Sequence, residues 1–290
     1  MNFKNILSEI EKADPEVYER LSGRRQALKS FGSKVAMAAL PLAIGSMFNK
    51  AYGKTSDGVV DALNIALEQE YLEYAFYRHG TNTGALIPAA DLAGFQAIEA
   101  HEKAHINFLS TAITAMGGVP FTPRHYTDPT TNAPYVPAAY DFTAGGRYGD
   151  VFNNYGTFLI IAQLLEDTGI HAYKGQIPAF IGTAVLTQAF EIQATEARHA
   201  AYVRLVRRLN PSLSPEYPAP WITNNIPPTA ALQPYYVTEE NVQQENVIIT
   251  TLPDTYNTSG TVPQISATAA FDEAYDITRV GTLMAPFKTL

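Results

Sequence analysis

Glutamate and histidine side chains at helical spacing are the residues of this chain best suited to chemistry. Two Glu-x-x-His pairs occur, Glu102 with His105 and Glu196 with His199. Residues three positions apart project from nearly the same side of a helix, so each pair can present a carboxylate and an imidazole to one cation. Carboxylate and imidazole ligands together suit iron, manganese and, less selectively, zinc.

One further glutamate precedes each pair at nearly the same distance. Glu70 lies 32 positions before Glu102, and Glu166 lies 30 positions before Glu196. The repeat indicates one helical hairpin written twice, with the two copies facing each other across a pseudo-twofold axis. The candidate metal ligands are Glu70, Glu102, His105, Glu166, Glu196 and His199.

Four long helical patterns must position these residues. Caps and stops predict them at about 56–80, 88–117, 152–176 and 178–209. The link over about 118–150 is long, aromatic and proline-rich, whereas the other two links are short. Short links make antiparallel hairpins, and a long one can carry the chain along the bundle. The prediction is an all-α, up-down-down-up four-helix bundle with a long crossover between helices two and three.

The core-facing seam of each helix recurs at alternating steps of three and four residues. Each seam is apolar except for one Glu or one Glu/His pair near its middle. Burying four carboxylates in one core is prohibitive unless positive charge lies among them. No seam offers Lys or Arg, so the simplest source of that charge is bound metal.

Other polar residues lie on or beside the seams. Seam tyrosines are expected to be mainly core aromatics, although they could hydrogen-bond the ligands; they are Tyr74, Tyr77, Tyr155 and Tyr173. The off-seam glutamates are expected at the surface; they are Glu68, Glu73, Glu99 and Glu191. Of these, Glu73 and Glu99 flank the seams and could support the ligands. His101 projects about 100° away from Glu102 around the helix, so we do not expect it to be a direct ligand.

Composition and charge exclude several classes of function. The 290 residues include no cysteine, which excludes thiolate catalysis, thiolate-held metal clusters and disulfides. The net charge of −8 argues against a nucleic-acid binder. Residues 1–53 hold eight basic and five acidic residues, and the remainder holds 12 basic and 23 acidic residues. A basic segment of +3 therefore precedes an acidic body of −11.

The basic segment has the features of an export signal. Arg24-Arg25 precede a moderately apolar run at 35–48, and small residues at 51–53 offer a cleavage site before Lys54. The paired arginines resemble a twin-arginine signal. We expect an exported, periplasmic protein with no stable membrane span after signal removal, and leave cleavage open. An amphipathic helix or a retained anchor is the alternative.

The predicted organisation has three parts: an export signal at 1–53, the bundle at 54–210 and a C-terminal extension at 211–290. The extension is rich in Pro, Thr, Asn and Tyr, with a strand-like run at 246–251 and a short helix near 267–275. Its apolar residues favour ordered packing on the bundle over a docking arm or a partly disordered tail.

Several segments resemble a known family, the bacterial ferritin-like domain family that includes desiccation-related proteins. Residues 62–73 are similar to its first helix. Its later helices are matched by residues 165–167, 172–175 and 196–202, and a C-terminal element of the family is matched by residues 271–273. The resemblance is good over about residues 57–210. One Glu from each of two helices plus Glu-x-x-His from each of the other two is the known ligand pattern of ferritin-like di-iron and di-manganese proteins.

The resemblance implies a ferritin-like bundle that binds two metal ions per chain, iron first and manganese next. In this interpretation Glu102 and Glu196 bridge the ions, His105 and His199 each cap one, and Glu70 and Glu166 are terminal ligands. The leading hypothesis is oxidation of ferrous ion, or consumption of O₂ or peroxide in stress protection, including a catalase-like reaction. The alternative is a non-catalytic, metal-stabilised structural or partner-binding protein. Homo-oligomers are possible, and iron storage would need a cage of them.

Overall fold

A computed structural model describes residues 56–123, 140–210, 218–254 and 260–289, all within one compact unit at Lys50–Leu290. The predicted export signal and its cleavage site lie outside the described residues. So do residues 124–139 of the predicted crossover.

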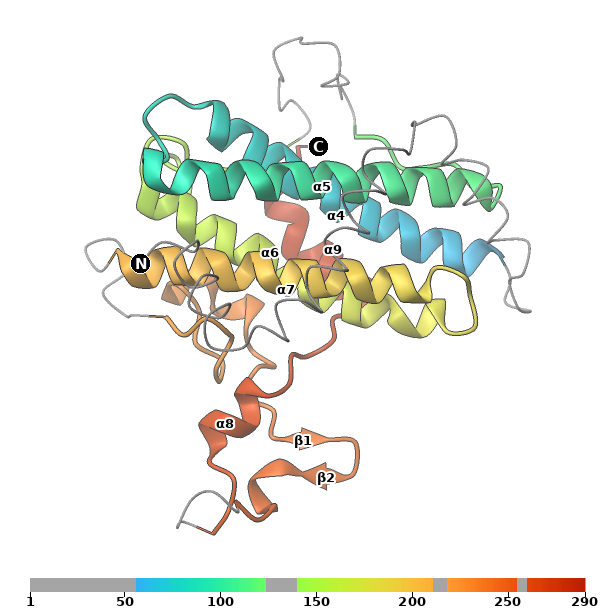
Figure 1. Cartoon of the computed structure of the whole chain (residues 1–290), viewed down its shortest axis with the longest axis vertical. Helices are drawn as coiled ribbons and strands as arrows, with labels where there is room; N and C mark the ends of the chain where they lie inside the picture. The colour runs from blue at the N-terminus through green and yellow to red at the C-terminus, as the bar shows by residue number, and fades with distance from the viewer. Residues whose placement is uncertain (1–55, 124–139, 211–217, 255–259, 290) are drawn as a thin grey trace, which may run out of the picture. The chain divides into compact units, whose positions relative to one another are not determined.

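Four long helices form the bundle, as predicted, and the fold is all-α with a loop-rich C-terminal extension (Figure 1). They are α4 (Ser56–Asn82), α5 (Ala89–Ala115), α6 (Tyr155–Phe180) and α7 (Leu186–Leu209). Asn154 caps α6, because its side chain accepts hydrogen bonds from the backbone N–H groups of Gly156 and Thr157.

Side-chain pairs within each hairpin establish its direction. Between α4 and α5, Arg78 pairs with Glu99 at 3.0 Å, whereas Glu70 meets His105 at 3.0 Å. The residue numbers rise on one helix as they fall on the other, so the two helices are antiparallel. The same holds between α6 and α7, where Asp167 contacts Arg204 and Gln163 contacts Arg207.

The two hairpins meet mainly through α4 and α6. Tyr77 of α4 bonds Glu166 of α6, and Tyr173 of α6 bonds Glu70 of α4. These two helices are therefore also antiparallel, which gives the up-down-down-up order. A crossover at 116–154 connects the hairpins, as the sequence predicts.

The boundary between α6 and α7 differs from the predicted one. Pro178 was expected to begin the fourth helix, but it lies in the last turn of α6. Proline is most common in a first helical turn, where its missing N–H is not needed; its fixed φ is still helical, so Pro178 can lie in the last turn of α6, with no N–H to donate there. Gly182, with φ +79°, follows the end of α6, and α7 begins at Leu186.

Helix α6 is the most enclosed element. Every residue from Ile161 to Tyr173 is buried, which one neighbouring helix on each side cannot achieve. The additional cover comes from the extension, since α9 (Ile277–Met284) and the 3-10 helix η2 (Ala230–Tyr235) both pack against α6. Tyr236, directly after η2, donates its hydroxyl to Asp167 at 2.6 Å.

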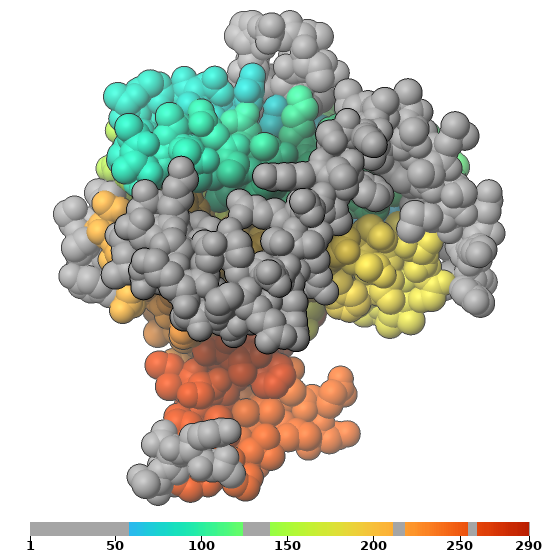
Figure 2. Space-filling view, viewed as in Figure 1, coloured from blue at the N-terminus to red at the C-terminus, as the bar shows by residue number. Residues whose placement is uncertain are grey.

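The remaining extension is made of short elements. They are β1 (Gln243–Gln244), β2 (Val247–Ile248), the 3-10 helices η3 (Ile249–Thr251) and η4 (Ala285–Phe287), and α8 (Gln264–Ala269). The strands pair antiparallel, with Gln244 opposite Val247. In the space-filling view, these strands and α8 form one surface in orange and red (Figure 2). The strand-like run predicted at 246–251 is a strand only at β2 and continues as η3, and the short helix predicted near 267–275 overlaps α8 only at 267–269, so both predictions are correct only in part.

No helix in the described ranges combines the length and the apolar character needed to cross a membrane.

The contact between α6 and residue 275 tests how firmly the extension is held. A Cβ added to Gly175 would lie 1.8 Å from the backbone oxygen of Tyr275. Gly175→Ala should therefore displace this segment and lower the free energy of unfolding by about 1–3 kcal/mol, measured by urea denaturation. Gly58→Ala in α4, with no atom within 4 Å of its Cβ, is the control and should be neutral or stabilising. Equal stability of the two variants would contradict the packing.

Candidate metal centre

The structure brings all six predicted ligands together at the middle of the bundle. The four glutamates are fully buried, and His199 is 4% exposed. His105 is less enclosed, with 12% of its side chain exposed. Each helix contributes its Glu or its Glu/His pair from a core-facing seam, because steps of three and four return to the same face of a helix.

The six side chains form two overlapping groups. Glu70 and His105 belong to one, Glu166 and His199 belong to the other, and Glu102 with Glu196 belong to both. In each group, one potential ligand atom per residue lies within 4.8 Å of all the others. Each hairpin therefore supplies its own terminal carboxylate and imidazole, and the two shared carboxylates stand where bridging ligands were predicted.

The imidazoles face these carboxylates through Nδ1. His105 Nδ1 lies 3.0 Å from Glu70, 3.1 Å from Glu102 and 3.2 Å from Glu196. His199 Nδ1 lies 2.9 Å from Glu102, 3.4 Å from Glu166 and 3.7 Å from Glu196. Each ring nitrogen thus has three carboxylates around it, which is more than one N–H can satisfy.

Burial and mutual repulsion dominate the electrostatics. Burial, with Glu196 nearby, raises the pKa of Glu102 well above its ordinary value. Burial also raises the pKa of Glu166 to about 7. Glu196 is equally buried, yet its contacts with His105 and His199 lower its pKa to about 2. Burial disfavours charge on both imidazoles, but the facing carboxylates raise their pKa values. Metal ligation needs the same nitrogens deprotonated, so a cation and a ring proton compete here.

Unsatisfied atoms show that the residues fit a metal. Among the described residues, five buried atoms of the centre form no hydrogen bond of good geometry, although each lies within 4 Å of an oppositely charged group: Glu102 Oε1, Glu166 Oε2, Glu196 Oε1, Glu196 Oε2 and His199 Nδ1. Buried polar atoms normally have a hydrogen-bond partner, and all five of these atoms belong to residues of the two ligand groups. Oxygen and nitrogen donors of this kind match iron or manganese.

Two tyrosines link the hairpins crosswise. Tyr77 donates its hydroxyl to Glu166 Oε1 at 2.5 Å, and Tyr173 donates to Glu70 Oε1. Each tyrosine lies seven residues after the glutamate of its own helix, so the bonds obey the same pseudo-twofold symmetry as the ligands. The alternative that seam tyrosines hydrogen-bond the ligands therefore holds for these two.

Two further side chains were not predicted to join the centre. Glu73, expected at the surface, is fully buried, so that expectation is wrong. Its position three residues after Glu70 on the same helix was the available signal. The exposed His101 is not in either group, as expected, but its Nδ1 lies 2.9 Å from Nε2 of His199. It therefore fixes the ring of His199 from the side away from the carboxylates.

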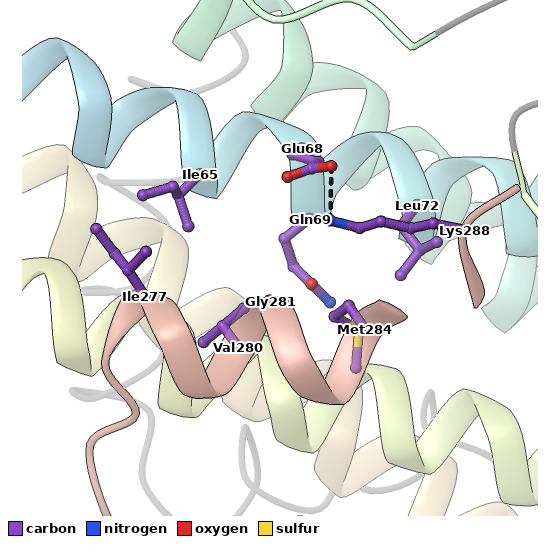
Figure 3. A pocket seen from close by; sticks show the side chains of 9 residues that line it. All are labelled: Ile65, Glu68, Gln69, Leu72, Ile277, Val280, Gly281, Met284 and Lys288. Atoms are coloured by element: carbon purple, nitrogen blue, oxygen red, sulfur yellow. Dashed lines mark ion pairs between the residues drawn. The ribbon is translucent and has the colours of Figure 1, made fainter. Parts of the chain in front are cut away.

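A cavity of about 120 Å³ lies between α4 and α9, beside the centre (Figure 3). Glu68 and Lys288 form an ion pair at 2.6 Å in its wall. Gln69 extends from α4 towards Met284 of α9, and its Nε2 donates to Glu73 Oε1 at 3.0 Å. Gln69 thus both lines this cavity and contacts Glu73.

Comparison with known proteins gives one family match. A family model described as a ferritin-like domain matches residues 58–208, which is more than half of the chain and includes all six candidate ligands. No curated protein matches the sequence.

The crosswise tyrosines should hold the two hairpins together. Tyr77→Phe and Tyr173→Phe each remove a donor from a buried carboxyl group, so each should lower the free energy of unfolding by about 1.5–3 kcal/mol in urea denaturation. Tyr155→Phe is the matched control, because its hydroxyl bonds the half-buried Asp91 at 2.9 Å outside the centre. Losses no larger than that of the control would contradict the role.

Proposed function

The chain belongs to the ferritin-like domain family, and from that premise we propose that it holds two metal ions, iron or manganese, and acts as an oxidase. Its substrates would be ferrous ion, O₂ or peroxide, and its role stress protection. The export signal predicted at 1–53 supports a periplasmic location for this activity.

One observation carries the proposal. Four carboxylates are fully buried in one core with only two imidazoles facing them, and five of the centre's buried atoms form no hydrogen bond of good geometry among the described residues. Uncompensated burial of several charges is prohibitive, whereas divalent cations at this point would satisfy the unpaired atoms. Metal binding therefore explains at once the charge, the symmetry and the unsatisfied atoms.

The ligand roles follow from the two groups. Glu102 and Glu196 would bridge, with Glu70 and His105 completing one position. The remaining two ligands, Glu166 and His199, would complete the other. When bound, two such ions supply electrons as a pair to O₂ or peroxide.

The surrounding side chains prepare the centre. The hydroxyls of Tyr77 and Tyr173 hold the terminal carboxylates in place before any ion arrives. His101 holds the ring of His199 so that Nδ1 faces the carboxylates. Complete burial of the four glutamates keeps bulk water away, which strengthens every charge interaction within the centre.

Glu102→Ala tests the activity. Both groups use Glu102, so this substitution should remove metal binding and reduce O₂ and peroxide consumption by the ferrous-loaded protein to background. Circular dichroism should show intact helices. Glu191→Ala, which removes an exposed carboxylate from α7, is the control and should behave as wild type. Wild-type protein that binds metal but consumes neither oxidant would favour the structural or partner-binding alternative.

Metal binding should also stabilise the fold. A ligand that binds only the folded state at 100 times its Kd adds about 2.7 kcal/mol to the free energy of unfolding. Added Mn²⁺ should therefore raise the urea midpoint of the wild type and leave that of Glu102→Ala unchanged. An equal shift in both proteins would locate the binding elsewhere.

A further inference from the structure

The two halves of the centre differ three residues after their terminal glutamates. Glu70 on α4 and Glu166 on α6 are equivalent, and each is followed seven residues later by the tyrosine of its helix. Three residues after Glu70 stands Glu73, but three residues after Glu166 stands Gly169. A carboxylate on one helix thus corresponds to the absence of a side chain on the other.

The structure shows why these two residues occur together. A Cβ added to Gly169 would lie 2.9 Å from Glu73 Oε1 and 3.7 Å from Glu196 Oε2. The carboxylate of Glu73 therefore occupies the space that a side chain at 169 would fill, and it approaches Glu196 there. Glycine inside a helix costs about 1 kcal/mol relative to alanine, so this space is obtained at a cost in stability.

The carboxylate of Glu73 lacks a compensating charge. Its Oε1 accepts one hydrogen bond from Gln69, and its Oε2 has no partner among the described residues. Within the same ranges, no Lys or Arg forms an ion pair with it. A buried oxygen without a partner needs an explanation, and a cation bound nearby would supply one.

Its position favours one metal position over the other. Glu196 Oε1 lies 3.2 Å from His105, whereas Oε2, the atom that shares the space beside Gly169 with Glu73, lies 3.7 Å from His199. Glu73 therefore approaches the group that contains Glu166 and His199, although it projects from the helix of Glu70.

We propose that Glu73 is a fifth carboxylate of the centre and makes its two cation positions unequal. It lies outside both ligand groups but adds negative charge beside the position of Glu166 and His199. That position then binds a divalent cation more tightly and fills first. This inference rests on the proposed metal centre, and it assigns unequal roles to two positions that the ligand pattern alone makes equivalent.

Titration of the full chain with Mn²⁺ by calorimetry tests the inference. The wild type should bind two ions in two resolved steps. Glu73→Gln keeps the shape of the side chain but removes its charge, so the tight step should weaken by about 10- to 100-fold and approach the weak one. Glu191→Gln removes an exposed charge from α7 and should leave both steps unchanged.

Gly169→Ala provides a second test that keeps the charge. The added methyl group should push the end of the Glu73 side chain away from Glu196 and weaken the same step. Alanine favours a helix, so circular dichroism should show an intact fold.

The outcomes separate the two hypotheses. Two equal wild-type steps, or a Glu73→Gln titration identical to the wild type, would overturn the role of Glu73 while leaving the metal centre in place. A wild type that binds no Mn²⁺ would overturn the proposed centre itself.

Discussion

The cost of burying carboxylates together is the constraint on which the rest of the structure depends. Glu70, Glu102, Glu166 and Glu196 are fully buried in one core, and Glu73 joins them. Positive charge must lie among them, and the facing imidazoles supply only two possible cations. The fold answers this constraint with antiparallel helices that bring the carboxylates within reach of common cations. It also supplies tyrosine hydroxyls that fix their orientation.

Near-symmetry of the two hairpins follows from the same constraint. A two-ion centre needs terminal ligands on both sides and shared ligands between them, and two copies of one hairpin provide both. The crosswise bonds of Tyr77 and Tyr173 preserve this symmetry. Glu73 breaks the symmetry, because Gly169 stands at the equivalent position of α6. His101 breaks it too, because the residue before the second Glu/His pair is Thr195.

Much of the fold and of the centre could be predicted from the sequence, because seam spacing links a residue number directly to a helix face. A lone Glu within an apolar seam, such as Glu166, therefore indicated its own burial. The boundary at Pro178 was predicted wrongly, since proline is most common in a first helical turn and here lies in a last one. Spacing placed Glu73 beside the seam, but its full burial also depends on the missing side chain at Gly169, a contact between helices that the spacing does not reveal. The contact of His101 with His199 depends likewise on how α5 and α7 meet.

X-ray diffraction from crystals of the full chain, recorded at the iron and manganese absorption edges, tests the central claim most directly. The account predicts two anomalous peaks per chain, each beside one imidazole, with the carboxylates of Glu102 and Glu196 between them. Crystals grown with either metal that show no anomalous peak at these residues, and the imidazoles bonded to the carboxylates instead, would contradict it.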